Sequence, residues 1–220
     1  MYHYGGLGQR QLLGNNPVKY VDPDGREAAF VLDEEGAGGM AHAGLYVKTN
    51  EGYSFFEVNG MDDNLQLGDQ CQDYDNSVVL SNGPVSMPAP WLALSLGFAT
   101  SAGASRRDFK SKEALMEYLC SAGSNNGYDT VIEFPTTQKQ DSIIYSQAMK
   151  KGENFSGYEL LGNSCGVYAR NVLISSGTGI YEPSIQMFDL YGILDKNAPF
   201  AIGNKLLMAN PSATIFLIKK

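Results

Sequence analysis

The sequence predicts an α+β fold in which helices and antiparallel strands are interspersed. Short runs of β-branched and aromatic residues bounded by Gly and Asn predict strands, and amphipathic segments bounded by Ser or Gly predict helices. The two kinds of segment do not follow the regular strand–helix–strand alternation of a parallel sheet. With 220 residues, of which 43% are hydrophobic, the chain can bury a core of ordinary size.

Six segments are predicted as strands because they are short, apolar and rich in residues that favour extended backbone. The second and third are expected to pair as a hairpin, because Thr49–Gly52 between them contains the Asn and Gly that hairpin loops favour. In chain order the predicted strands are 28–32, 41–48, 53–58, 77–80, 130–134 and 213–218.

Three segments are predicted as helices. Ser111 is a candidate N-cap, and Leu115 and Leu119 after it share one helical face. Gly152 and Gly177 lie just beyond the other two segments, where glycine commonly ends a helix. The predicted helices are 111–120, 141–151 and 165–175.

The charge balance and the scarcity of histidine exclude several classes of function. Lys and Arg total 16 against 24 Asp and Glu, so a formal charge of −8 argues against a phosphate-binding surface and against nucleic acid as a partner. Two histidines and three cysteines leave little for a Cys/His zinc cluster or a disulfide framework. We therefore expect neither a metal nor a cofactor.

Residues 76–105 carry no formal charge. Prolines 84, 88 and 90 interrupt this stretch, and the part after the last proline is shorter than the roughly 20 apolar residues of a membrane helix. We interpret the stretch as a buried or pocket-lining wall for an acyl chain or peptide, with Trp91 as a candidate substrate-binding residue. Membrane contact is the less favoured alternative.

The first 26 residues consist of turn-forming sequence without a sustained apolar face. Within them, Tyr2-His3-Tyr4 followed by Asn15-Asn-Pro-Val-Lys-Tyr-Val-Asp-Pro-Asp-Gly25 closely resembles the end of an RHS-repeat core of bacterial polymorphic toxins. The intervening segment 7–14 departs from the usual shorter connection. The resemblance covers about an eighth of the chain.

This resemblance implies a domain organisation and a biological setting. Residues 1–26 would be a core remnant or linker, and 27–220 a variable C-terminal toxin domain. The chain would act as a secreted or delivered bacterial effector without a classical signal peptide. A cognate immunity protein would be its expected partner in the producing cell.

Three cysteines compete for the role of a nucleophile, which requires a lowered thiol pKa. Cys71 is surrounded by aspartates that disfavour a thiolate, and Cys120 ends a helix beside its apolar face. Cys165 stands where an amphipathic helix begins, so unpaired backbone N–H groups and the helix dipole favour a negative sulfur and could form an oxyanion hole. An ordinary buried thiol remains the alternative.

His42 is the candidate partner by elimination, because His3 belongs to the N-terminal segment. Glu57 on the return strand of the hairpin is placed to hold an imidazole in one tautomer, and Asn59 is the second choice. A structural histidine and an exposed strand carboxylate are the alternatives for His42 and Glu57.

A second resemblance rests on His42-Ala-Gly-Leu-Tyr-Val, the hairpin with Phe-Glu-Val, and Tyr158-x-Leu-Leu-x-Asn-Ser-Cys165 leading a helix. Together these motifs resemble the circularly permuted papain-like superfamily, which is similar to NlpC-type peptidases and lecithin:retinol acyltransferase-like proteins. Ser164 departs from the Asn that usually precedes the cysteine, and Asn163, one position earlier, is a candidate substrate-binding residue.

The resemblance implies a papain-like antiparallel sheet packed against a cysteine-bearing helix, with the histidine strand first in the chain. It implies a thiol hydrolase or transferase in which Cys165 attacks an acyl carbon, His42 transfers the proton and Glu57 orients His42. The expected substrate is a protein, peptide or lipid in a target cell, cleaved, deamidated or transferred at an amide or ester. The alternatives are a membrane-active toxin using residues 76–105 and a non-catalytic binding module.

Overall fold

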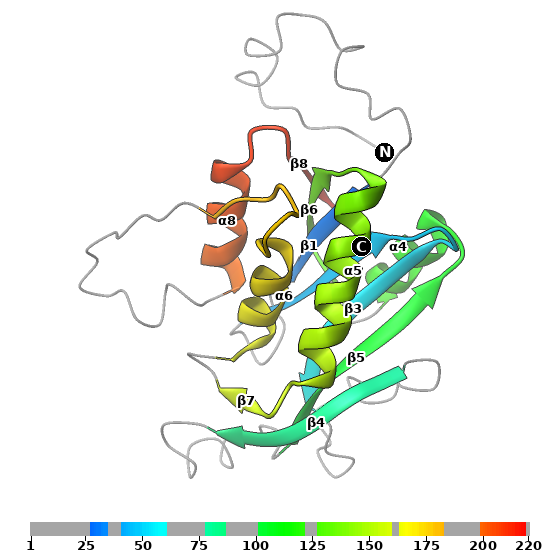
Figure 1. Ribbon diagram of the computed structural model, residues 1–220. Helices are drawn as coiled ribbons and strands as arrows, with labels where there is room; N and C mark the ends of the chain where they lie inside the picture. The colour runs from blue at the N-terminus through cyan, green and yellow to red at the C-terminus, as the bar shows by residue number, and fades with distance from the viewer. Residues whose placement is uncertain are drawn as a thin grey trace, which may run out of the picture.

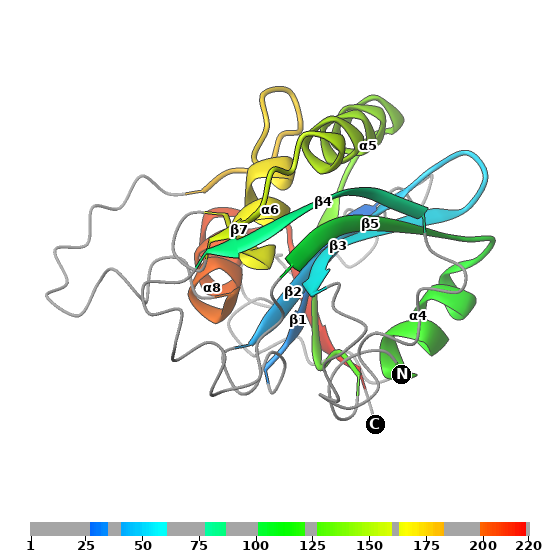
Figure 2. The same ribbon diagram turned by 90° about the horizontal axis from the view of Figure 1, so that it is seen from below.

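The computed structural model describes residues 27–34, 41–60, 78–86, 101–121, 127–159, 163–182 and 199–218. These residues form a mixed α+β fold around one twisted sheet with the strand order β7-β4-β5-β3-β2-β1-β6-β8 (Figures 1 and 2). The strands are β1 (Glu27–Asp33), β2 (His42–Lys48), β3 (Tyr53–Gly60), β4 (Val78–Ser86), β5 (Ser101–Phe109), β6 (Thr130–Pro135), β7 (Tyr158–Glu159) and β8 (Thr214–Leu217). The helices are α4 (Lys112–Ser121), α5 (Gln138–Glu153), α6 (Cys165–Leu173) and α8 (Pro199–Ala209).

Helices cover both faces of the sheet. Helices α5, α6 and α8 lie on one face and α4 lies on the other (Figure 2). The sequence of strand β1 is continuously apolar because both faces of the strand are buried. Phe30 packs into the core on the α6 side, and Val31 packs into the core on the α4 side. A strand buried on both faces does not show the alternation of polar and apolar residues that a half-exposed strand shows.

The predicted hairpin is present between β2 and β3. The N–H of Thr49 donates to the carbonyl of Gly52 at 2.7 Å, and Gly52 has φ +138°, a backbone conformation that glycine adopts readily. In the resulting register Gly44 stands opposite Glu57. The hairpin therefore determines which side chains of β3 lie beside the start of β2.

The predicted helices are also present, and their caps explain where they begin. Helix α5 starts at Gln138 rather than 141, because Thr137 and Gln140 form a capping box at its N-terminus. Helix α6 starts at Cys165, as predicted, because the side chain of Ser164 accepts a hydrogen bond from the N–H of Val167. The serine that departs from the papain-like pattern thus acts as the N-cap of this helix.

Two elements were not predicted: β5 and α8. Strand β5 is rich in small residues, yet it pairs with β3 and β4, and Ala104 on it is fully buried. Strand β7 runs parallel to β4, with Val85 opposite Tyr158, so the sheet is not wholly antiparallel as expected. This two-residue strand is held by tertiary pairing, which local propensity does not encode.

The uncharged stretch 76–105 contributes to the sheet at both of its ends. Strand β4 and the first half of β5 come from it and pair with each other. Residues 87–100, with Trp91, lie outside the described residues, as do 1–26 and Cys71. Among the described helices, none combines the length and the apolar character that crossing a membrane requires.

Candidate functional site

Three elements converge at the point where strand β2 begins. Helix α6 packs along β1, β2 and β3 through a buried apolar face that includes Val172 and Leu173 (Figure 1). This packing brings the N-terminus of α6, with Cys165, to His42, the first residue of β2. Glu57 on β3 lies beside the same histidine.

Cys165 is buried in an environment that stabilises a thiolate. Burial alone would raise the pKa of Cys165, but the charge of His42, its hydrogen bond to the sulfur, and the backbone N–H groups of Ala43 and Gly166 lower the pKa below its usual value. One of these N–H groups comes from the first turn of α6 and the other from strand β2. The helix N-terminus therefore contributes to the negative sulfur as its position suggested.

His42 is the positive partner of this sulfur. Burial would lower the pKa of His42, but the charge of Cys165, the hydrogen bond to Cys165, and the contact with Glu57 raise it to about 10. The Nε2 atom of His42 lies 3.6 Å from Oε2 of Glu57, an ion pair slightly longer than a hydrogen bond. The raised pKa of His42 and the lowered pKa values of Cys165 and Glu57 all favour an imidazolium between a thiolate and a carboxylate.

Glu57 is held by a group of polar side chains. The hydroxyl of Tyr128 donates to Oε2 at 2.7 Å, and the hydroxyl of Tyr118 donates to Oε1 at 3.4 Å. Burial would raise the pKa of Glu57, but the interactions with His42, Tyr128 and Asn59 lower it. Asn59, the alternative orienting residue, thus contacts the carboxylate.

The site joins the two layers of the core. Cys165 belongs to the core cluster on the α6 side of the sheet, whereas Tyr128 belongs to the cluster on the α4 side. The imidazole of His42 contacts groups from both, and its ring centroid lies 5.9 Å from that of Tyr128. Buried Asp33 on β1 stands opposite His42 in the strand register, as a second nearby carboxylate.

The backbone immediately before His42 is in an unusual conformation. Ala41 has φ +64°, and among the described residues it is the single non-glycine residue with a positive φ. A left-handed conformation costs an alanine about 1 kcal/mol or more and persists where the surrounding structure enforces it. Such strain clusters at functional sites.

Tyr158 is a further contact of the sulfur that sequence reasoning did not assign. It lies on β7, and its hydroxyl forms a hydrogen bond with Cys165. Burial, the charge of Cys165 and this hydrogen bond raise the pKa of Tyr158, so its hydroxyl stays protonated at neutral pH. The residue stands in the quoted cysteine motif, but only tertiary pairing with β4 brings it to the sulfur.

The remaining candidate residues have identifiable positions. The Nδ2 of Asn163 donates to the carbonyl of Gly157 at 2.5 Å, and the backbone of Asn163 pairs with Glu159, so this residue stabilises the chain before Cys165. Its role in substrate binding stays a prediction. Cys120 lies at the end of α4 and forms no disulfide with another described cysteine. Within the described ranges no three His, Cys, Asp or Glu side chains are grouped to hold a metal ion.

Comparisons with known proteins do not assign a family. No family model matches the chain, and no curated protein matches it. The crystal structure of the type VI secretion system effector TseH is similar to this chain with a TM-score of 0.47 and 9% sequence identity, over 86% of this chain and 97% of that one.

Proposed function

We propose that the domain is a cysteine hydrolase or acyl transferase in which Cys165 is the nucleophile, His42 the general base and acid, and Glu57 the group that orients His42. One observation carries this proposal: a single buried imidazole lies between a thiol at a helix N-terminus and a carboxylate. A nucleophile beside a base that is itself held by a third group is the arrangement that acyl transfer requires.

The proposed reaction begins with attack of the Cys165 thiolate on the carbonyl carbon of an amide or ester. The C–S bond forms as the carbonyl electrons move to oxygen. His42 then donates its proton to the leaving amine or alcohol as the C–N or C–O bond breaks, which leaves an acyl-enzyme. Water, deprotonated by His42, releases the acid and restores the thiolate; a second amine in place of water gives transfer.

Donors for the oxyanion are available around the sulfur. The N–H of Gly166 is in the first turn of α6, where N–H groups have no intrahelical partner. The N–H of Ala43 and the hydroxyl of Tyr158 approach the sulfur from the sheet. We propose that these donors stabilise the negative oxygen of the tetrahedral intermediate.

The fold is proposed to be papain-like and circularly permuted. Support comes from the order of the elements, since the strand that begins with His42 precedes the helix that begins with Cys165. The motif resemblance around both residues supports the same assignment. The substrate class remains an amide or ester in a protein, peptide or lipid.

The biological setting is proposed from the N-terminal sequence. The RHS-like residues 1–26 support a toxin domain at 27–220 that is delivered to a target cell and neutralised by an immunity protein in the producing cell. Membrane-active killing through residues 76–105 is the alternative, and it does not require Cys165.

The first experiment measures the rate at which a small thiol reagent modifies Cys165 between pH 4 and pH 10, by mass spectrometry of the full chain. Burial slows the reaction at every pH alike, so the midpoint of the profile reports the thiolate. We expect a midpoint well below the ordinary thiol value of about 8.5, and a shift toward that value in His42→Ala. A midpoint for Cys165 that is the same in the unsubstituted protein and in His42→Ala would contradict the proposal.

The second experiment produces the domain in susceptible bacterial cells. Cys165→Ala and His42→Ala should abolish toxicity, whereas Cys120→Ala, the matched control, should leave it intact. Undiminished killing by Cys165→Ala would eliminate the enzyme proposal. Leakage of liposomes by the same variant would then identify the membrane-active alternative.

A further inference from the structure

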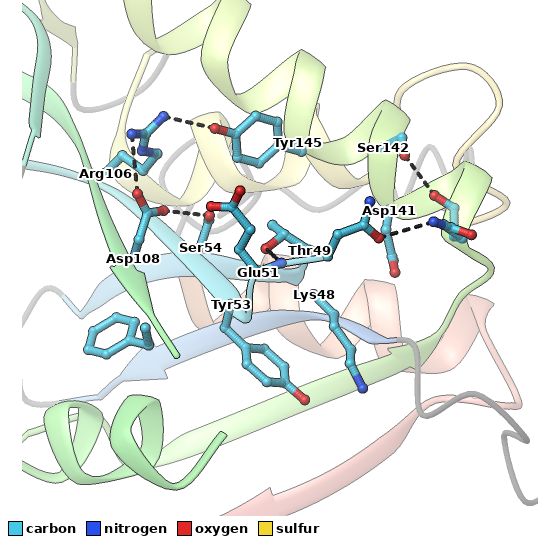
Figure 3. A pocket seen from close by; sticks show the side chains of 13 residues that line it. Lys48, Thr49, Glu51, Tyr53, Ser54, Arg106, Asp108, Asp141, Ser142 and Tyr145 are labelled. Carbon is cyan, nitrogen blue, oxygen red and sulfur yellow. Dashed lines mark hydrogen bonds and ion pairs between the residues drawn. The ribbon is translucent and has the colours of Figure 1, made fainter. Parts of the chain in front are cut away.

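A polar cavity lies at the other end of the β2–β3 hairpin from His42. Its volume is about 400 Å³, and it lies between the hairpin loop, the end of β5 and the start of α5 (Figure 3). Lys48 at the cavity lies six residue steps along β2 from His42, which corresponds to about 20 Å at the usual rise of a strand. The cavity is therefore separate from the candidate catalytic site.

Arg106 lies on one wall of the cavity, where its positive charge is paired with Asp108. Nη2 of Arg106 lies 3.2 Å from Oδ2 of Asp108, and Nη1 donates to the hydroxyl of Tyr145 at 2.8 Å. Asp108 also accepts a hydrogen bond from the hydroxyl of Ser54 at 2.6 Å. Figure 3 shows this group together on one side of the cavity. These contacts hold the guanidinium on the wall.

The cavity is acidic because more carboxylates than bases line it. The lining contains three carboxylates, those of Glu51, Asp108 and Asp141, against the two bases Lys48 and Arg106. Asp141 is buried in the first turn of α5 and accepts a hydrogen bond from Thr136, whereas Glu51 is exposed in the hairpin loop. Glu51 thus lies at the rim of the cavity, whereas the charge of Asp141 acts on the cavity from beneath its wall.

The N-terminus of α5 does not make the cavity a binding site for anions. A helix N-terminus by itself attracts anions through its unpaired N–H groups. Here the capping box of Thr137 and Gln140 occupies an N–H of that turn, and the carboxylate of Asp141 adds a negative charge beside it. The carboxylates of Asp141 and Glu51 would repel an anionic ligand in the cavity.

Aromatic rings complete the lining. Tyr53, Phe109 and Tyr145 border the cavity, and the ammonium of Lys48 already lies 5.8 Å from the ring centroid of Tyr53. Carboxylates combined with aromatic faces favour organic cations, because the ring quadrupole and the negative charge attract the same group. A cavity of this volume lies within the range of small-molecule sites.

We propose that this cavity binds a small organic cation through an ammonium or guanidinium group. Glu51 and Asp141 supply the negative charge, the rings of Tyr145 and Phe109 border the bound cation, and hydroxyl groups such as that of Thr49 accept further hydrogen bonds. Binding here is independent of the Cys165 chemistry. A guanidinium could arrive as a free molecule or as an arginine side chain.

Isothermal titration calorimetry of the full chain at low salt tests the proposal with agmatine, spermidine and acetyl-arginine amide as probes. We expect saturable binding of the amines that weakens with added salt, and no binding of glutamate or inorganic phosphate. If acetyl-arginine amide binds as tightly as agmatine, an arginine side chain is a sufficient ligand. If it binds more weakly, the ligand is a free molecule with a second positive group. Absence of saturable binding of all three cations would overturn the proposal.

Single substitutions test whether agmatine binds in this cavity. Glu51→Gln should weaken agmatine binding about threefold to fivefold, the factor typical of an exposed ion pair. Glu117→Gln, which removes another exposed carboxylate, from α4 on the opposite face of the sheet, should leave binding unchanged. Equal affinity in both variants, with circular dichroism showing both folded, would place the ligand elsewhere. Cys165→Ala should bind agmatine normally, so this test and that of the proposed enzyme fail separately.

Discussion

The Nε2 atom of His42 lies 3.6 Å from Oε2 of Glu57, and the two residues come from neighbouring antiparallel strands. Glu57 stands opposite Gly44, two positions after His42 on the same face of β2, so the contact is diagonal across the hairpin. Tyr128 donates to the same carboxylate oxygen and restrains it. The geometry makes Glu57 the residue whose replacement should alter His42 without altering Cys165 directly.

Glu57→Gln should reduce the modification rate of Cys165 at pH 7 by about tenfold or more. The variant removes the negative charge that stabilises the imidazolium, so the pKa of His42 falls and the midpoint for Cys165 rises. The pH profile of thiol modification measures both effects. Glu117→Gln is the matched control, and a profile unchanged in Glu57→Gln would show that the carboxylate does not act on the pair.

Unfolding stability should follow the proton balance of the Cys165–His42 pair. In the proposed imidazolium–thiolate state the native pair holds one proton, on the imidazole, whereas the unfolded chain holds one on the thiol between about pH 6.5 and 8.5. Folding therefore takes up no net proton in that window, and the contribution of the pair is independent of pH there. Below it, the unfolded chain binds a second proton, so the stability due to the lowered pKa of Cys165 is lost as pH falls.

Above about pH 8.5, the raised pKa of His42 determines how stability changes with pH. The unfolded chain loses its last proton near the ordinary thiol pKa, but native His42 retains its own until about pH 10, so stability falls as pH rises. Each slope approaches about 1.4 kcal/mol per pH unit for one proton. Urea unfolding of the protein and of Cys165→Ser/His42→Gln, compared from pH 5 to 10, measures the difference. A difference that rises steadily across the range would refute the ion pair.

Tyr158→Phe should raise the midpoint of Cys165 modification by less than one pH unit, because a donor to the thiolate is lost without a change in shape. If the hydroxyl also serves the oxyanion, turnover of an identified substrate should fall about a hundredfold in kcat with little change in KM. Tyr181→Phe, at an exposed tyrosine, is the matched control. Identical profiles for the two variants would remove Tyr158 from the site.

Ala41→Gly should stabilise the protein by about 0.5 to 1 kcal/mol. Glycine adopts the left-handed backbone of this position without the steric cost of an alanine, and that gain exceeds its greater freedom in the unfolded chain. Urea unfolding measures the change. Ala114→Gly in the exposed face of α4 provides a control of opposite sign, with a loss of about 1 kcal/mol. A loss of stability in Ala41→Gly would show that the methyl group contributes packing that outweighs the strain.

Local sequence signals predicted most of the elements that carry the candidate site. The start of α6 at Cys165 follows from Ser164 as its N-cap, and the β2–β3 hairpin follows from its loop. Strand β5 was missed because its alanines and glycine have low strand propensity, and it is stabilised by pairing with two neighbours. Helix α8 was missed although Pro199 at its first position is a known signal for a helix start. Its packing against β1 and α6 stabilises it.

By itself, the sequence determined the α+β class, the helix that begins at Cys165 and the reduction of the histidine choice to His42. Those properties depend on residue counts and on contacts within a few positions of the chain. Only the tertiary structure decided that Tyr128 holds Glu57, that Tyr158 reaches the sulfur and that an acidic cavity forms beside Asp141. The contact of Tyr128 with Glu57 and the cavity join segments that are distant in the chain, and the pairing of strands and the packing of helices bring them together. Tyr158 is near Cys165 in the chain, but the pairing of β7 with the distant strand β4 positions it.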